Sequence, residues 1–228
     1  MIGVRTFQVA RTLMVATLTA AAAAVSVVNS PVAAAVSCPD VEVVFARGTA
    51  DRTGLGWAGK AFVDSLKWKL LGKRVSAYAV DYPASWNFSK STSEGAVDAN
   101  KHVQYIAGMC PDTKIVLGGM SQGAGVIDLI TIGNRTIWFF RPAPLPESMV
   151  DHIAAIAVFG NPSRDVSTLG PLTQISPLYG DRAIDLCANG DPYCSNGINF
   201  FAHFAYRWNG MINEAATFTA GRVLGIDS

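Results

Sequence analysis

The chain has 228 residues with 18 basic and 17 acidic side chains, a formal charge of +1, and half of its residues are hydrophobic. The sequence shows no basic stripe and no polybasic run, which removes the usual electrostatic basis for binding nucleic acid or an anionic membrane. The length suits one domain with a sizeable core once a leader is set aside.

The beginning of the chain has the layout of a signal peptide. Two arginines precede an apolar stretch at residues 13–28, and three alanines at 33–35 offer a small-residue cleavage site. The stretch is marginally short for a membrane-spanning helix and is interrupted by hydroxyl side chains. We therefore predict export, with residues 1–35 either cleaved or kept as an N-terminal anchor. Residues 36–228 would then form a single catalytic domain.

Further along the chain, apolar runs of strand length alternate with segments of helical period. Strands are predicted at residues 41–46, 75–82, 115–117, 153–159 and 183–186. Helices are predicted at residues 57–71, 122–131 and 211–224. A further helix is predicted to open at the capping box Ser91 to Glu94, with Val97, Val103 and Ile106 facing inward. Because parallel neighbours need a crossover, this alternation predicts an α/β fold with a mostly parallel sheet covered by helices on both faces.

Residues 119–123 read Gly-Met-Ser-Gln-Gly and directly follow the third predicted strand. A Gly-x-Ser-x-Gly sequence between a strand and a helix is the nucleophile elbow of serine hydrolases. The turn is so tight that larger side chains at 119 and 123 would collide with the neighbouring strand and helix. It exposes the hydroxyl of Ser121 and directs the amide of Gln122 toward a developing oxyanion. The pattern therefore predicts Ser121 as a nucleophile.

A serine hydroxyl needs a base to take its proton, and the chain has three histidines. His102 lies on the helix before the elbow and His152 at the opposite end of the sheet, so surface roles are expected for both. His203 lies between the last predicted strand and the closing helix, where the chain returns to the carboxyl edge of the sheet. It is the candidate base, in preference to a core histidine among aromatic residues.

Four cysteines follow the leader, at Cys38, Cys110, Cys187 and Cys194. An even number in an exported chain predicts two disulfides, with three possible pairings. The natural choice joins Cys187 to Cys194 locally and Cys38 to Cys110. Zinc is the competing interpretation, but no Cys-x-x-Cys spacing or clustered histidine supports a metal site.

The acid that orients the base is expected between the serine and the histidine in chain order. Four aspartates have that position: Asp165, Asp181, Asp185 and Asp191. Ordinary surface roles suffice for Asp181 and Asp185. Asp191 lies between two cysteines, and a disulfide-closed loop would hold its carboxylate rigidly against an imidazole. Asp191 is therefore the candidate acid, with a plain turn residue as the alternative. A second oxyanion donor is expected at Thr49, in the loop after the first strand.

Four segments together resemble the cutinase family, and more narrowly the exported cutinase-like proteins of mycobacteria: residues 45–49, 119–123, 187–194 and 203–206. The likeness covers residues 38–224. It implies a small α/β-hydrolase with an exposed serine, no large lid and no metal or organic cofactor. The implied catalytic residues are Ser121, Asp191 and His203, and the implied oxyanion donors are Thr49 and Gln122. The resemblance also implies the disulfides Cys38–Cys110 and Cys187–Cys194.

The predicted activity is that of an exported serine carboxylic ester hydrolase acting on fatty acyl or lipid esters through an acyl-enzyme. A carbohydrate acetyl esterase and a non-catalytic lipid-binding relative are the alternatives. We expect a monomer, secreted or associated with the cell envelope, with peripheral contact to membrane or envelope lipid as an option. The connection 134–144 contains Trp138, Phe139 and Phe140, which fit a buried cluster or a lipid-contacting flap. The flap is favoured because the segment has no helical or strand period.

Overall fold

The structure, a computed structural model, describes residues 2–3, 37–135, 137 and 139–226. The predicted signal peptide lies outside these residues except for positions 2–3, and Trp138 lies outside them as well. One compact unit begins at Ser37 and contains all of the helices and strands described below. Within the described residues, no helix is both long enough and apolar enough to span a bilayer.

Among the described residues, five parallel strands form one sheet in the order β2-β1-β3-β4-β5. Their bounds are Val41–Ala46 for β1, Val75–Ala79 for β2, Lys114–Met120 for β3, Ile153–Phe159 for β4 and Ala183–Leu186 for β5. Strands β1, β3 and β4 are buried almost throughout, because helices cover both faces of the sheet. The predicted α/β fold with a parallel central sheet is confirmed.

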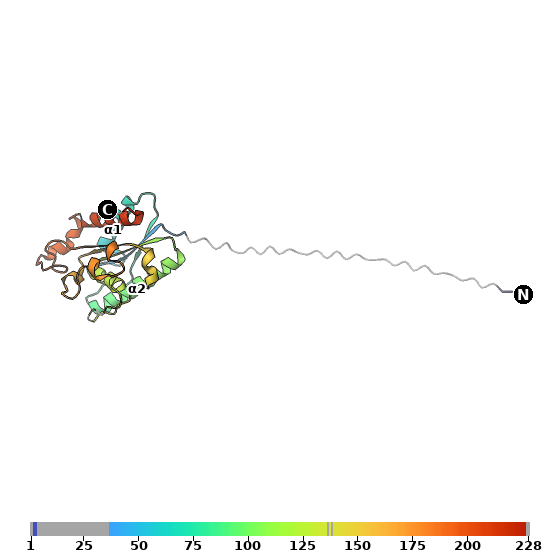
Figure 1. Cartoon of the computed structure of the whole chain (residues 1–228), viewed down its shortest axis with the longest axis horizontal. Coiled ribbons are helices and arrows are strands. Elements are labelled where there is room, and N and C mark those ends of the chain that lie inside the picture. Colours follow the sequence, from blue (N-terminus) through green and yellow to red (C-terminus); the bar gives the residue numbers. More distant parts are fainter. Residues whose placement is uncertain (1, 4–36, 136, 138, 227–228) are drawn as a thin grey trace. The chain divides into compact units, whose positions relative to one another are not determined.

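Two pairs of helices cover the sheet (Figure 1). α1 (Gly56–Lys69) and α5 (Met211–Leu224) pack together on one face, over a core that includes Phe45, Phe62 and Phe159. α2 (Phe88–Met109) and α3 (Gln122–Thr131) pack together on the other face. Shorter helices connect the later elements: η1 Glu147–His152, η2 Pro162–Asp165, α4 Leu172–Ile175, η3 Gly180–Arg182 and η4 Phe200–Arg207.

The strand order places a crevice at the carboxyl edge of the sheet. From β1 the chain first crosses to β2 on one side, and later returns to β3 on the other. In open α/β sheets, ligands bind where the order reverses in this way, beyond the carboxyl ends of the two central strands. Here those ends lead into the loop containing Thr49 and into the turn containing Ser121.

Helix α2 begins earlier than the sequence predicts. It starts at Phe88, so the predicted capping box at residues 91–94 lies inside the helix and does not cap it. Residues 91–93 are buried there because α2 packs on α3, and small side chains allow the two helices to approach closely. The inward orientation predicted for Val97 is also wrong, since this side chain is 43% exposed, whereas Val103 and Ile106 are buried as predicted.

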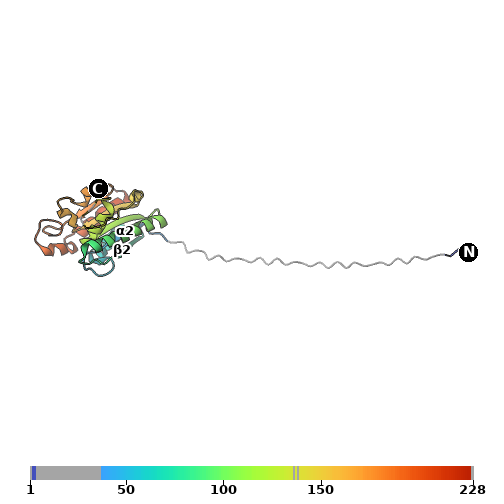
Figure 2. The same cartoon turned by 90° about the horizontal axis from the view of Figure 1, so that it is seen from below.

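The surface role predicted for His102 is wrong as well. Helix α2 lies beside the edge strand β2 (Figure 2), and the His102 ring stacks on that of Tyr78 with the centroids 3.5 Å apart. The Nε2 atom of His102 lies 2.5 Å from a carboxylate oxygen of Glu42 on β1. The Tyr78 hydroxyl donates to Asp98 on α2. This ring stacking and these hydrogen bonds therefore hold α2 against the sheet.

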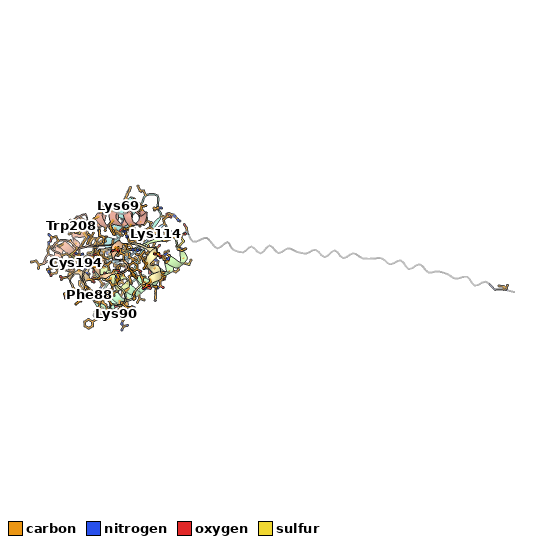
Figure 3. The ribbon with its side chains drawn as sticks, in the orientation of Figure 1. Lys69, Phe88, Lys90, Lys114, Cys194 and Trp208 are labelled. Carbon is orange, nitrogen blue, oxygen red and sulfur yellow. A yellow bond between two sulfur atoms is a disulfide. The ribbon has the colours of Figure 1, made fainter. Side chains whose placement is uncertain are left out.

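Both disulfides of the favoured pairing are present. Cys38–Cys110 joins the segment before β1 to the end of α2, and Cys187–Cys194 closes the loop after β5. Several large aromatic side chains remain exposed, among them Phe88 and Trp208, which lie at the periphery of the molecule (Figure 3).

Candidate active site

The Gly-x-Ser-x-Gly sequence forms the tight turn that its glycines predict. Ser121 connects β3 to α3 with φ 55° and ψ −117°, a backbone conformation that costs energy for any residue with a side chain. A Cβ atom at Gly119 would lie 2.3 Å from the carbonyl oxygen of Gly123. A Cβ atom at Gly123 would lie 2.0 Å from the carbonyl oxygen of Ala46. Only glycine fits at either position, so the motif reflects sterics at the crossing of β1, β3 and α3.

His203 and Asp191 form a hydrogen-bonded pair. The Nδ1 atom of His203, in η4, lies 2.8 Å from Oδ2 of Asp191. Burial alone would raise the pKa of Asp191, but hydrogen bonds from His203, the Tyr193 amide and the Tyr206 hydroxyl hold that pKa below its ordinary value. An ionised carboxylate can only accept hydrogen bonds, so the imidazole proton belongs on Nδ1. The lone pair of Nε2 is then available as a base.

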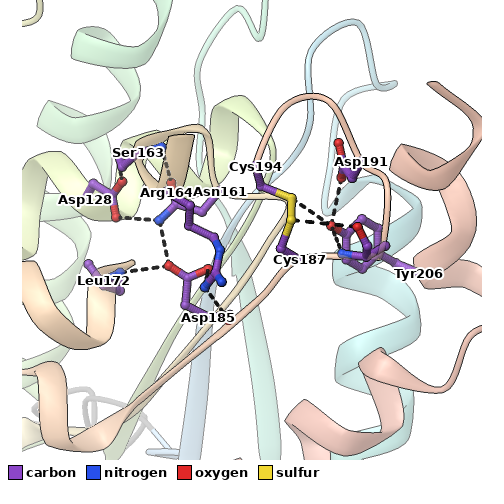
Figure 4. Close-up of polar contacts among 11 residues, drawn as sticks. Asp128, Asn161, Ser163, Arg164, Leu172, Asp185, Cys187, Asp191, Cys194 and Tyr206 are labelled. Atoms are coloured by element: carbon purple, nitrogen blue, oxygen red, sulfur yellow. Dashed lines mark hydrogen bonds and ion pairs between the residues drawn. A yellow bond between two sulfur atoms is a disulfide. The ribbon is translucent and has the colours of Figure 1, made fainter. Parts of the chain in front are cut away.

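Tyr206 is a site residue that the sequence analysis missed as a functional group. Its hydroxyl donates to Oδ2 of Asp191 at 2.8 Å and accepts from the amide of Ala188 at 2.9 Å, beside the Cys187–Cys194 disulfide (Figure 4). Burial raises the pKa of Tyr206, so it remains a donor. The spacing in the sequence offers a signal for this role. His203 and Tyr206 are three residues apart in η4, and residues three apart in a 3₁₀ helix lie on the same face.

A cavity of about 530 Å³ opens at this edge of the sheet. Four candidate residues line it, namely Ser121, His203, Thr49 and Gln122. Most of the remaining lining is apolar and comes from α3 and from the segments 137–140, 162–169 and 193–204. Asp191 lies behind His203 and is fully buried. The candidate nucleophile and the candidate base thus line one apolar cavity, and the candidate acid is screened from solvent.

The loop after β1 is held by hydrogen bonds that leave the amide of Thr49 available. Arg47, which is buried, donates to the carbonyl oxygen of Tyr82 at 2.6 Å, and the Tyr82 hydroxyl donates back to the Arg47 carbonyl. Asp51 accepts from the amide of Gly48 at 3.2 Å. Among the described residues, the amides of Thr49 and Gln122 have no hydrogen-bond partner. Two free N–H groups from residues that line the same cavity as Ser121 are what an oxyanion hole requires.

The Gln122 side chain is fixed by its own contacts. Its Nε2 donates to the carbonyl oxygen of Ser85 at 2.9 Å, and its Oε1 accepts from the Ser91 hydroxyl at 3.3 Å. These contacts tie the start of α3 to α2 and to the loop before it. They explain why Ser91 is buried within α2.

Comparison with known proteins identifies the family. Residues 37–223 match the family model for cutinase. The chain belongs to the cutinase family. This membership confirms the predicted serine carboxylic ester hydrolase. Carboxylesterase Culp1 of Mycobacterium tuberculosis is 46% identical to this cutinase-family protein over 190 residues, covering 82% of each chain. Phospholipase Culp4 of the same organism is 47% identical and covers 83% of this chain and 81% of its own.

Solved structures show the same fold. Trichoderma reesei cutinase, in complex with a phosphonate inhibitor, is 28% identical to the cutinase-family protein, with a TM-score of 0.67 and coverage of 82% of this chain and 77% of that one. An acetylxylan esterase is 26% identical, with a TM-score of 0.71 and coverage of 82% and 100%. The expected fold of a small α/β-hydrolase is therefore confirmed.

One aspartate of this cutinase-family protein differs from the prediction. Asp185, for which an ordinary surface role is expected, has a fully buried side chain. It contacts Asn161, Arg164 and the amide of Leu172. The strand that carries Asp185 packs against α4, and Arg164 of η2 donates to Asp185. These contacts turn a position of apparent alternation into a buried polar one. Asp165 and Asp181 are exposed.

In the aromatic segment 134–144, Phe139 and Phe140 differ in exposure. Phe139 is 88% exposed. Phe140 is partly buried, packs against the core on the α2–α3 face and lines the cavity together with Ile137. Phe139 thus has the exposure that a flap requires, whereas Phe140 belongs to the wall of the cavity. Within the described residues, no group of three or more His, Cys, Asp or Glu side chains is arranged for a metal ion.

Removing the loop disulfide is expected to lower kcat in protein that is still folded. In Cys187→Ser/Cys194→Ser, the loop that carries Asp191 loses its closure, and a misplacement of about 1 Å costs about 10²-fold in rate. The lost constraint on the unfolded chain is about 2–3 kcal/mol for a loop of this length. The measurements are kcat on a short-chain ester and the thermal unfolding midpoint.

The matched control is Cys38→Ser/Cys110→Ser, which opens a longer loop worth about 4 kcal/mol. This variant should lower the unfolding midpoint further while keeping a near-native kcat in the folded protein. An unchanged kcat in the loop variant would show that the ring is not needed to position Asp191.

Proposed function

We propose that this cutinase-family protein hydrolyses fatty acyl esters through an acyl-enzyme in which Ser121 is the nucleophile, His203 the base and Asp191 the orienting acid. The observation that carries the proposal is the arrangement of one cavity: Ser121 and His203 line it, and Asp191 accepts from the far nitrogen of the imidazole. Chain order, tautomer and burial agree with these roles.

The chemistry runs in two halves. Ser121 Oγ attacks the ester carbonyl carbon as His203 Nε2 takes its proton, and the amides of Thr49 and Gln122 donate to the oxyanion. The tetrahedral intermediate collapses, the carbon–oxygen bond to the alcohol breaks, and His203 returns the proton to the leaving oxygen. Water then attacks the acyl-enzyme by the same route, releasing the acid and restoring Ser121. Asp191 stabilises the imidazolium in both halves.

The apolar lining supports a fatty acyl substrate. Leu129, Ile137, Phe140, Val166 and Leu169 line the cavity beside Ser121. Burial of an acyl chain against such a surface stabilises the complex by about 0.8 kcal/mol for each methylene group. A carbohydrate acetyl esterase is the second candidate, favoured by the structural similarity to an acetylxylan esterase. An acetyl group would leave most of this lining unused.

Export and contact with lipid belong to the same proposal. Two disulfides are expected of an oxidising compartment, which supports a secreted or envelope-associated protein. Two exposed aromatic side chains, Trp86 and Phe200, line the cavity, and the exposed Phe139 and Phe201 each directly adjoin a lining residue in the sequence. Exposed apolar surfaces on soluble proteins usually mark binding sites. The proposed ligand of this surface is membrane or envelope lipid, which the protein would contact as a monomer.

The test of the substrate class is a chain-length series of p-nitrophenyl esters. For a fatty acyl esterase we expect kcat/KM to rise from acetate through hexanoate and octanoate. An acetyl esterase would give the highest value with acetate and a decline thereafter. A relative without catalytic function would hydrolyse none of the series and would leave Ser121 unlabelled by an alkyl phosphonate.

Exposure of Phe139 leads to a separate prediction. Phe139→Ser is expected to reduce activity on aggregated long-chain esters several-fold while sparing short soluble ones, because an exposed side chain loses interfacial contact and little packing. Phe140 is unsuited to this test, since it packs against the core. The matched control is Trp68→Ser on α1, which removes an aromatic side chain that is 76% exposed. A lowered unfolding midpoint with equal losses on all esters would assign Phe139 to packing.

A further inference from the structure

One wall of the cavity is formed by residues 161–172, the pocket-wall segment. It begins at the end of β4, includes η2, and contributes Pro162, Ser163, Val166 and Leu169 to the lining. A backbone hydrogen bond of 2.9 Å from the amide of Gly170 to the carbonyl of Ser163 closes the segment on itself. Its position against α3 therefore depends on how its two ends are held.

Asn161 holds the first end. Its Nδ2 group lies 3.2 Å from Oδ1 of Asp128 on α3 and 3.0 Å from Oδ2 of Asp185 on β5, so both amide hydrogens are used (Figure 4). Its Oδ1 accepts from the amide of Ser163 at 3.0 Å. Asn161 is fully buried. One carboxamide thus joins two carboxyl groups from different elements to the first turn of the pocket-wall segment.

Asp185 holds the second end and has a cation beside it. Its Oδ2 accepts from the amide of Leu172 at 2.8 Å, and its Oδ1 lies 3.3 Å from Nη1 of Arg164. The same guanidinium nitrogen donates to the Asp185 carbonyl oxygen at 3.0 Å. Burial raises the pKa of Asp185, and the Leu172 amide and Arg164 oppose this rise, so the carboxylate has a cationic partner within the cluster.

Asp128 is in a different electrostatic position. It is fully buried and hydrogen-bonds to Asn161 and to the Ser163 hydroxyl, with no cationic partner among the described residues. The charged groups that face the cluster are Asp185 from β5 and Arg164 from η2. Other elements packed on α3, namely α2, β1, β3 and β4, supply no titratable group to its interactions in the described part of the chain. Burial raises the pKa of Asp128 to about 8, with Asp185 adding to the rise.

We propose that protonated Asp128 is a positioning residue for the pocket-wall segment, and that its ionisation loosens this wall and weakens the binding of long acyl chains. The proposal rests on the proposed function, because it assigns the acyl chain to this cavity. Asp128 does not touch the reacting atoms. It lines the cavity itself and holds the start of the wall through Ser163 and Asn161.

The physical reason is the sharing of one amide by two carboxyl groups. When Asp128 is protonated, Asn161 contacts one neutral carboxylic acid, Asp128, and one carboxylate, Asp185, which pairs with Arg164. With Asp128 ionised, two carboxylates face each other through a single amide in a site of low dielectric. A buried charge without a cationic partner, such as that of ionised Asp128, is also stabilised by water. Water that enters to solvate it would disrupt the packing of the apolar wall. A long acyl chain needs that wall, whereas an acetyl group is too short to fill a cavity of this size.

The experiment compares the KM of p-nitrophenyl octanoate with that of p-nitrophenyl acetate from about pH 6 to about pH 9.5, a range that brackets the pKa of about 8 for Asp128. The ratio of the octanoate KM to the acetate KM cancels the effect of His203 protonation, because that effect is common to both esters. In the native protein the ratio should rise by about tenfold across this range, the effect of about one methylene group in an apolar pocket. In Asp128→Asn, whose carboxamide reproduces the neutral acid, the ratio should stay at its low-pH value.

A second variant, Ser163→Ala, decides the matter if Asp128→Asn does not fold. The Ser163 hydrogen bond favours ionised Asp128, so its loss should move the rise in the ratio to higher pH. An unchanged midpoint in Ser163→Ala contradicts the proposal, as does a flat ratio in the native protein or an identical rise in Asp128→Asn. If the native protein hydrolyses neither ester at any pH, the proposed esterase function fails instead, which separates the two ideas.

Discussion

Ser121→Ala is expected to abolish ester turnover, with kcat lowered on the order of 10⁶-fold, as for the loss of other triad nucleophiles. The fold should be unaffected. Serine and alanine share the Cβ atom that makes the positive φ of 55° unfavourable, so the strain at the elbow is the same in both proteins. The hydroxyl is the proposed nucleophile, and it makes no hydrogen bond within the described residues.

The measurement is kcat on a short-chain ester, together with the thermal unfolding midpoint. The matched control is Ser65→Ala on α1, whose hydroxyl contacts only Asn213 among the described residues, on the helix pair that covers the other face. It should keep native activity. Labelling by an alkyl phosphonate should occur in the native protein and in Ser65→Ala but not in Ser121→Ala. Hydrolysis at a tenth of the native rate in purified Ser121→Ala would rule out Ser121 as the nucleophile.

The elbow could be predicted from sequence because its constraint is local. Gly119 and Gly123 face backbone atoms at 2.3 and 2.0 Å from where a Cβ would stand, and no distant choice of side chain could relieve those contacts. The strands of the sheet were predictable for a related reason. A buried parallel strand is expected to be apolar on both faces. β4 shows this as a continuous apolar run, and β1 and β3 depart from it only at Glu42 and Lys114.

Features that depend on tertiary packing were not predictable in this way. The sequence Ser91 to Glu94 has the spacing of a capping box, yet α3 packs on this part of α2 and buries it inside the helix. Asp185 is expected to have an ordinary surface role until β5, η2 and α3 are placed together around Asn161. Tyr206 gains its role only because Asp191 is brought to it by the loop after β5.

Asp191→Asn is expected to lower kcat on the order of 10⁴-fold, the loss seen when a triad acid becomes an amide. Asp191 accepts from Tyr193 at one oxygen, at 2.9 Å, and from both His203 and Tyr206 at the other, at 2.8 Å each. A carboxamide must turn its NH₂ group toward one of these sets of donors. If it faces His203, it donates to Nδ1 and forces the proton onto Nε2, which removes the base. If the NH₂ group faces Tyr193, it meets the Tyr193 amide, and two donors then point at each other. In either orientation the negative charge that would stabilise the imidazolium is absent.

Tyr206→Phe provides the graded comparison for this prediction. It removes one donor to Asp191 but leaves the carboxylate ionised and bonded to His203, so the expected loss in kcat is about tenfold, in keeping with one hydrogen bond to a charged group. The readout that separates chemistry from folding is phosphonate labelling of Ser121 measured as a rate, with the unfolding midpoint recorded for each variant. Labelling should slow in the order native, Tyr206→Phe, Asp191→Asn. Equal labelling rates in the native protein and Asp191→Asn would mean that another group orients His203, because an imidazole held in the wrong tautomer cannot activate Ser121 toward any electrophile.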